Sequence, residues 1–97
     1  MLTMKELKGT ALKKALNAKS VSMRWHNKNK SGGNFGFNIR GVPNTADDFE
    51  LTGNYNEHGE VFGLRFGKIF WGNHPFRVKN YDELIQVLNA FFNKNAA

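Results

Sequence analysis

The amino-acid sequence predicts an α+β domain in which a central antiparallel sheet of three to four strands is flanked by two α-helices, one on each face. Apolar residues recur at helical spacing near both ends of the chain, and they alternate with polar residues through its middle. Turn-forming residues separate the alternating segments, as they do between antiparallel strands. Because two amphipathic helices need two apolar surfaces to cover, we expect one helix on each face of the sheet.

The first helix is expected to open at Thr3, because Glu6 follows three residues later in a capping-box arrangement. Gly9 weakens this helix, so its regular part is expected to begin near Thr10. Its apolar side is expected to consist of Leu7, Ala11, Leu12, Ala15 and Leu16. The closing helix follows Asn80, a favourable N-cap residue, and its buried face is expected to hold Leu84, Ile85, Val87, Leu88 and Phe91.

Four segments between the helices alternate apolar and polar residues, as half-buried strands do: residues 20–26, 35–40, 49–55 and 61–66. The last two are joined by residues 56–59, which are typical of a hairpin turn. The segment that follows, up to Pro75, is expected to form a loop or a short extra hairpin. It carries Phe70 and Trp71, which either plug the core or form an exposed recognition surface.

Length and composition indicate one globular domain over residues 1–97. The chain has 97 residues, of which 40% are hydrophobic and 13% aromatic, enough for a single core. It has no cysteine, which excludes disulfides and thiol nucleophiles, and we expect a cytoplasmic monomer, or one in the host cytosol if it belongs to a secreted effector. Lysines interrupt the N-terminal segment, so we expect neither a signal peptide nor a membrane span there.

The net charge of +6 is distributed unevenly along the chain. Residues 1–40 hold nine lysines and arginines against one acid, Glu6, whereas residues 41–97 hold five against seven acids. The first part is therefore expected to bind an anion. Nucleic acid, an anionic membrane surface and a phosphorylated or acidic peptide are the partners that this charge favours.

The first predicted strand leads directly into a basic segment that ends in two glycines. Alternation places Val21, Met23 and Trp25 on one face of the strand, and Ser22, Arg24 and His26 on the other. Residues 27–33 are expected to form a loop whose backbone N–H groups and lysines converge on an anion held by Arg24. This stretch predicts a phosphate pocket; the alternative is a solvated hairpin turn whose strand carries an arginine.

The order of these elements and several short motifs resemble the Src-homology-2 (SH2) family, whose members bind phosphotyrosine peptides. Residues 21–26, V-S-M-R-W-H, are similar to the family's F-L-V-R-E-S strand and place Arg24 on its phosphate-binding arginine. The resemblance spans roughly residues 7–92, through Ala11, Ala15 and Leu16 in the first helix, Asp48–Leu51, Asn56–Gly59 and Val78–Ile85. It implies an SH2-like fold and a tyrosine-phosphorylated peptide or protein as the partner.

The resemblance also implies a set of binding residues. Arg24 would grip the phosphate, and the residues that would support it are Lys8, Ser22, His26, Lys28, Asn29, Lys30 and Ser31. The residues expected beside the phosphotyrosine ring are Gly36, Asn38, Asp48 and Glu50. Contacts with the rest of the peptide are expected from Phe49, Tyr55, Phe70, Trp71 and Ile85, for which core packing is the alternative.

The chain departs from the family's pattern at several positions. The usual W-Y-x-G entry strand is missing, and Asp48 and Glu50 replace the histidine and lysine that commonly flank the ring. An acid there repels phosphate unless it turns outward or pairs with a neighbouring lysine. These departures indicate a divergent member, similar to SH2-type domains of bacterial proteins.

Two further functions remain open from the sequence, and neither is enzymatic. A basic half, aromatic residues and a sheet would also suit a small nucleic-acid-binding domain. A non-enzymatic inhibitor that acts by protein contact is the other alternative. We expect no enzyme, no cofactor and no metal, because His26, His58 and His74 lack the spacing of metal ligands and no nucleophile motif is present.

Overall fold

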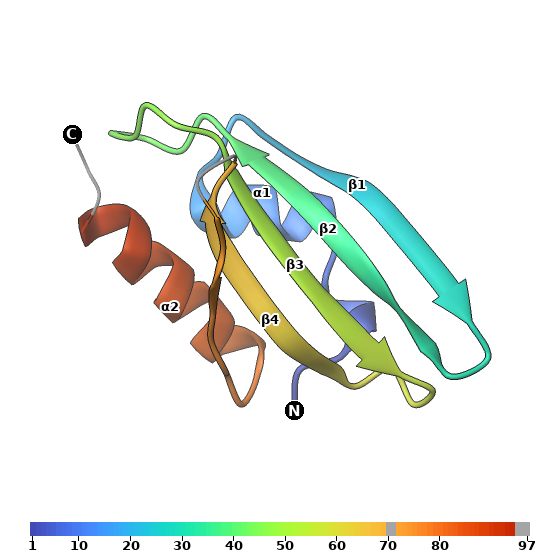
Figure 1. Cartoon of the computed structure of the whole chain (residues 1–97). Coiled ribbons are helices and arrows are strands. Elements are labelled where there is room, and N and C mark those ends of the chain that lie inside the picture. Colours follow the sequence, from blue (N-terminus) through green and yellow to red (C-terminus); the bar gives the residue numbers. More distant parts are fainter. Residues whose placement is uncertain (70–71, 95–97) are drawn as a thin grey trace.

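The computed structural model describes residues 1–69 and 72–94. Its elements follow the predicted order, with a 3-10 turn η1 (Met4–Glu6) and helix α1 (Gly9–Leu16) before the sheet and helix α2 (Tyr81–Lys94) after it. The strands are β1 (Ser20–Asn29), β2 (Gly32–Arg40), β3 (Phe49–Asn56), β4 (Val61–Lys68) and β5 (His74–Pro75). They form one antiparallel sheet in the order β1-β2-β3-β4-β5 (Figure 1). The α+β class is confirmed, and the sheet has one short strand more than predicted.

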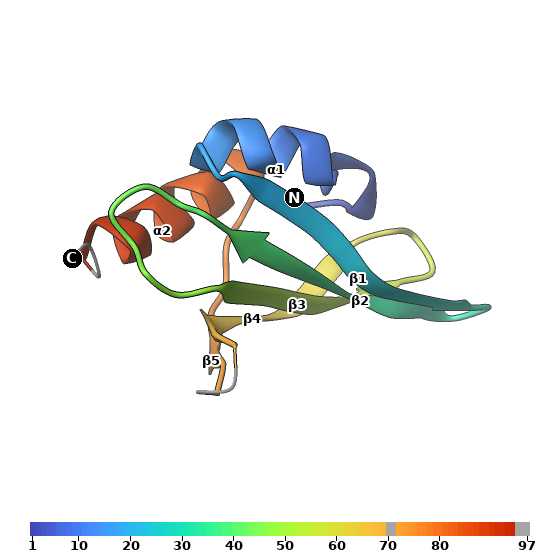
Figure 2. The same ribbon diagram turned by 90° about the horizontal axis from the view of Figure 1, so that it is seen from above.

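Both helices lie on the same face of the sheet, so the prediction of one helix on each face is wrong (Figure 2). Helices α1 and α2 contact each other, and their buried residues join one core with the strands. This core includes Leu12, Leu16, Phe35, Phe37, Ile39, Phe49, Leu51, Leu84, Leu88 and Phe92. The strands have only one apolar face, because the alternating positions of β2 and β3 on the other face are glycine or polar. Within the described residues, no helix is long and apolar enough to cross a membrane.

Aromatic packing fixes α2 against β3 and β4. Phe49 and Phe66 are stacked with ring centroids 5.7 Å apart, and Phe92 meets Phe49 edge-on at 4.9 Å. Such pairs add about 0.5–1.5 kcal/mol to the burial of the rings. Val87, which was expected on the buried face of α2, is 36% exposed, because the apolar stripe runs through Leu84, Leu88 and Phe92 instead.

The N-terminal segment follows the predicted capping pattern, but only for one turn. The backbone N–H and hydroxyl of Thr3 both donate to Glu6 Oε1 at 3.0 Å, and the α-helix proper begins later, at Gly9, close to the predicted start. Ala11 and Ala15 are exposed, contrary to expectation, because the eight-residue helix α1 buries only Leu12 and Leu16. The apolar stripe of α1 is therefore narrow, and the helix contacts the sheet through these two leucines.

A β-bulge in β1 changes which side chains share a face. Met23 pairs with Phe37 and Trp25 pairs with Gly36, so Arg24 is an extra residue without a counterpart on β2. Directly opposed residues in an antiparallel pair point to the same face, and the bulge therefore breaks the alternation. Trp25 lies on the face away from the helices, and His26 lies on the helix-covered side. The prediction that Trp25 shares a face with Val21 and Met23, and that His26 shares the other face with Ser22, is therefore wrong.

The prediction of a phosphate-binding loop over residues 27–33 is also wrong. Strand β1 continues to Asn29 and β2 begins at Gly32, which leaves only Lys30 and Ser31 as the turn. Cross-strand pairing of Asn27 with Asn34 keeps the backbone extended, so that successive N–H groups point to opposite sides of the strand and do not converge on one anion. The alternative, a solvated hairpin turn, is what the structure contains.

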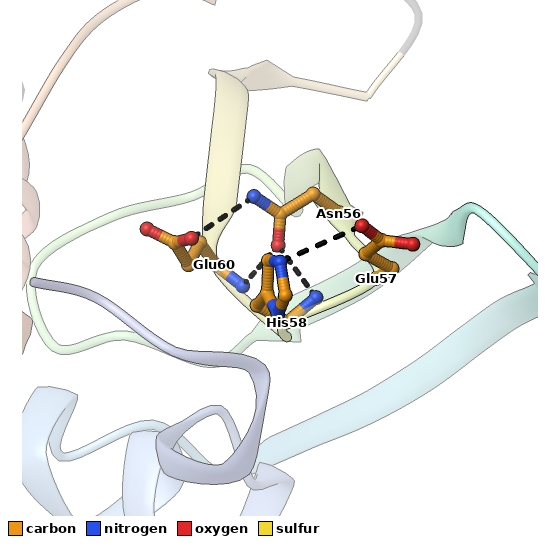
Figure 3. A network of polar contacts seen from close by, with 4 residues as sticks. All are labelled: Asn56, Glu57, His58 and Glu60. Carbon is orange, nitrogen blue, oxygen red and sulfur yellow. Dashed lines mark hydrogen bonds and ion pairs between the residues drawn. The ribbon is translucent and has the colours of Figure 1, made fainter.

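The turn between β3 and β4 is stabilised by one asparagine side chain, as Figure 3 shows. Asn56 Oδ1 accepts the backbone N–H groups of His58 and Glu60 at 3.0 Å each, and its Nδ2 donates to Glu60 Oε1 at 3.2 Å. The predicted hairpin turn is confirmed. The N-terminal chain pairs beside it, where Val61 N–H donates to Leu2 O at 3.0 Å. The N-terminal segment thus covers part of the β4 edge.

Candidate functional site

The sheet face turned away from the helices, here called the outer face, carries three cross-strand rows of side chains. Strand register places opposed residues side by side on this face. From β1 to β4, the first row is Asn27, Asn34, Asn54 and Phe62; the second is Trp25, Gly36, Thr52 and Arg65; the third is Ser22, Asn38, Glu50 and Gly67. The outer face therefore combines aromatic, amide and guanidinium groups on a rigid sheet.

Trp25 lies flat on the sheet over Gly36. Three adjacent carbons of its six-membered ring, Cζ2, Cη2 and Cζ3, occupy the space that a Cβ on Gly36 would need. The indole Nε1–H donates to Asn34 Oδ1 at 3.1 Å, so the ring is held at its edge as well as on one face. The other ring face is directed away from the sheet, which is the orientation required for stacking on a planar ligand.

Hydrogen bonds fix the orientation of two amides beside Trp25. Asn34 Oδ1 accepts from the indole and also from Asn27 Nδ2 at 3.0 Å. An indole N–H can only donate, so the oxygen of Asn34 must face it and the oxygen of Asn27 must point elsewhere. Asn34 therefore keeps its amide N–H groups, and Asn27 its carbonyl oxygen, for a ligand next to the ring.

Two adjoining hollows run across the outer face toward the β4 edge. A shallow one of about 210 Å³ is bounded by Trp25 and Thr52, and a larger open one of about 980 Å³ is lined by Phe62, Phe76 and Arg77. Both are also lined by Asn54, Gly63 and Arg65, so they form one continuous surface. Phe62 is 57% exposed. Neither hollow has an acidic side chain among its described lining residues.

The segment that contains β5 closes one end of the outer face, on the side opposite the helices (Figure 2). Its Asn73 accepts a hydrogen bond from Arg65 Nη2 through the backbone oxygen at 2.9 Å and donates through Nδ2 to Glu50 Oε1 at 3.0 Å. Gly67 permits this approach, because a Cβ there would overlap Gly72 O. The segment thus orients Arg65 and occupies one oxygen of Glu50.

Asn38 is the polar side chain of the outer face that is most deeply enclosed. It is 5% exposed, and its Oδ1 is buried without a hydrogen-bond partner. Its neighbours across the strands are Ser22 and Glu50. A buried acceptor without a partner costs about 1–3 kcal/mol, so its presence calls for a reason.

The residues predicted to hold phosphate do not converge on one pocket. Arg24 is exposed in the bulge and makes no hydrogen bond or ion pair with another described residue, and Ser22 lies on the outer face. His26 bonds instead to the hydroxyl of Tyr55 at 2.6 Å on the other side of the sheet. Lys8 precedes α1 in the helix layer. The basic residues around the expected loop are exposed at the hairpin tip: Lys28, Asn29, Lys30 and Ser31.

The predicted ring-flanking residues are only partly brought together. Gly36, Asn38 and Glu50 share the outer face, but the space above Gly36 is filled by Trp25 and does not admit a tyrosine ring. Asp48 forms an ion pair with Arg40 at 3.5 Å. Its charge is therefore partly compensated, by an arginine and not by a neighbouring lysine.

Most of the predicted peptide-binding residues belong to the core. Phe49 and Tyr55 are buried at 1% and 7% exposure, and Ile85 packs against the core from α2. Their placement follows from the register, which turns Phe49 and Tyr55 toward the helices. Phe70 and Trp71 lie outside the described residues.

Sequence reasoning did not single out Asn34, Thr52, Asn54, Phe62 or Arg65 as site residues. The signal that was available is the content of the polar positions on β2 and β3, which are amides and a hydroxyl where a solvated face commonly has lysine and glutamate. Their register with Trp25 depends on the bulge, which the alternation pattern does not reveal.

Comparisons of the chain with models of known protein families, with curated protein sequences and with solved structures found no match. The function is therefore argued from the geometry and chemistry of the outer face.

Proposed function

We propose that this chain binds single-stranded nucleic acid across the outer face of its sheet. The observation that carries the proposal is the continuous surface from Trp25 to Arg77, which combines the half-buried ring of Trp25 and the exposed ring of Phe62 with arginines and has no acidic side chain among its described lining residues. Single strands bind to such surfaces because bases stack on aromatic rings while cations follow the phosphates.

The outer face offers an aromatic ring on each of two strands, so more than one base can stack on it. Trp25 on β1 and Phe62 on β4 are three inter-strand spacings apart, roughly 14 Å across the sheet, and they lie in neighbouring rows. Trp25 is held in place before binding, so little conformational entropy is lost when a base stacks on it. The amides of Asn34 and Asn54 lie between the two rings, where base edges would pass.

The charges that line the hollows favour phosphate, and Glu50, the acid in the three rows, lies outside that lining. Arg65 and Arg77 line the hollows, and Arg24 is exposed in the bulge. Lys28 and Lys30 stand at the exposed tip of the β1–β2 hairpin, near the row that begins with Asn27. Release of counterions from the bound phosphates would supply much of the affinity, which should fall steeply with salt.

The phosphotyrosine-binding function implied by the SH2 resemblance stays a prediction. It is the alternative function that the experiment must distinguish from nucleic-acid binding. A single exposed arginine contributes less to phosphate binding than one in a desolvated pocket. Arg24 has no second cation converging on it from the predicted set, because His26 and Lys8 lie elsewhere. The geometry supports binding of a nucleic-acid strand with many phosphates better than binding of a single phosphotyrosine.

The proposal is tested by fluorescence anisotropy with a labelled single strand of about 12 nucleotides, within the usual site size. We expect Trp25→Leu to weaken binding about 5- to 100-fold, the value of one stacked base, and Arg65→Gln to lower the affinity and the salt dependence. Lys13→Gln, on the exposed side of α1, is the matched control and should leave binding unchanged. Thermal unfolding by circular dichroism checks that each variant is folded.

The same assay with tyrosine and phosphotyrosine forms of a peptide library separates the two functions. Absence of single-strand binding at low salt contradicts the proposal. Binding of the phosphorylated peptides alone, abolished by Arg24→Ala, contradicts it as well and supports the phosphotyrosine prediction.

A further inference from the structure

The outer face contains one polar group that folding leaves unsatisfied. Asn38 Oδ1 is buried and has no hydrogen-bond partner among the described residues, although Asn38 points to the face that no helix covers. Other amides on this side are engaged: Asn27 and Asn34 bond to each other, and Asn73 bonds to Glu50. An apolar residue at position 38 would avoid the cost of the unpaired acceptor.

Asn38 is close to the stacking ring. It lies two residues from Gly36 along β2, about 7 Å away, and Trp25 covers Gly36. Trp25 and Asn38 lie on the same face in neighbouring rows, so a ligand stacked on the ring lies next to the row of Asn38. A nucleotide stacked on Trp25 would therefore bring a donor into the neighbourhood of Asn38.

We propose that Asn38 is a recognition residue that accepts a hydrogen bond from a neutral donor of the nucleotide bound at Trp25. This inference rests on the proposed nucleic-acid function. The acceptor oxygen requires an N–H or O–H group. A nucleotide offers two such donors, the ribose 2′-hydroxyl and the exocyclic amino group of adenine, cytosine or guanine. A cationic donor would meet the charges of Arg24 and Arg65 on this part of the sheet, and the carboxylate of Glu50, directly opposite Asn38, already accepts a hydrogen bond from Asn73.

Access to the buried oxygen requires a neighbouring side chain to move. Ser22 lies directly opposite Asn38, and Arg24 follows it in the bulge. Both are exposed and make no hydrogen bond or ion pair with another described residue, so little holds them in place. These two side chains are therefore free to adjust when a nucleotide binds.

The experiment measures dissociation constants by anisotropy for four labelled strands: oligo(rU), oligo(dU), oligo(rA) and oligo(dA). The rU to dU ratio isolates the 2′-hydroxyl, because uracil has no exocyclic amino group. The dA to dU ratio reports the amino group together with the larger stacking surface of adenine, so the part due to the amino group is the part that Asn38→Leu removes. The wild type should prefer the strand that carries the donor by about 5- to 10-fold, the effect of one hydrogen bond.

Asn38→Leu removes both polar atoms at similar size, and it should abolish the preference while keeping the affinity for the weaker strand. Asn54→Leu makes the same change in the first row, and it should leave the ratio intact even if overall affinity falls. The unfolding midpoint of Asn38→Leu should be equal to or above that of the wild type, because the unpaired acceptor is gone.

Equal binding of all four strands by the wild type contradicts the role of Asn38 but leaves the proposed function standing. The same holds if Asn38→Leu retains the preference. Failure of the wild type to bind any of the four strands contradicts the proposed function itself.

Discussion

The two faces of the sheet are formed by the same strands but carry different kinds of side chain. The helix-covered face is filled by side chains such as Phe37 and Leu51, which are fully buried and belong to the core. The outer face carries amides, glycines and one flat tryptophan, and it even encloses the unpaired oxygen of Asn38. Burial of apolar surface explains the first face. The outer face holds side chains in fixed positions that folding does not require, so a binding function is expected on this face.

The largest effect that separates the two faces should come from truncating phenylalanine on each. Phe49→Ala removes a ring that is 1% exposed and stacks on Phe66, and we expect a loss of about 3–5 kcal/mol in the free energy of unfolding. Phe62→Ala, the matched change on the outer face, should cost less than about 1 kcal/mol while weakening single-strand binding. Urea denaturation measures both. Comparable losses of stability would contradict the distinction between the faces.

A smaller effect is expected from Gly36→Ala, which fills the space under the ring of Trp25. The added methyl group should expel the ring at a cost of about 1–3 kcal/mol, and the hydrogen bond to Asn34 should be lost. The indole N–H resonance of Trp25 in an NMR spectrum reports this change, and single-strand affinity should fall with it.

Thr52→Ala is the control for this substitution, because Thr52 is opposite Gly36 in the same row. Thr52→Ala should leave the chemical shift of the Trp25 indole N–H unchanged. An unshifted resonance in Gly36→Ala would show that the ring does not depend on the glycine.

The smallest effect concerns the helix layer at alkaline pH. The pKa of Tyr81 is raised above its ordinary value of 10.0, first by burial and then by the negative charges of Glu6 and Asp82. The folded state therefore favours the neutral phenol, so this stabilisation is complete below pH 10 and is lost as pH rises through the raised pKa. Unfolding midpoints across this range should fall less steeply for Tyr81→Phe than for the wild type. Parallel profiles would contradict the assignment.

Much of the candidate site lay beyond the reach of sequence patterns, for a reason visible at Arg24. Alternation placed Trp25 in the core and Arg24 in a phosphate pocket, but one extra residue in β1 reverses the faces after Met23. A bulge leaves no periodic signal in a single strand. The same shift brings Trp25 over Gly36 and beside Asn34, residues that are distant in sequence and share no motif.

The sequence by itself determined the α+β class, the order of the elements and the turn at Asn56, because periodicity and turn chemistry are local properties of the chain. Tertiary structure decided that both helices share one face, since their placement depends on where apolar surface remains once the strands have paired. It also decided that the basic segment after His26 is a hairpin and not a loop, because pairing between the two strands continues as far as Asn29 and Gly32. The outer face is a product of that pairing.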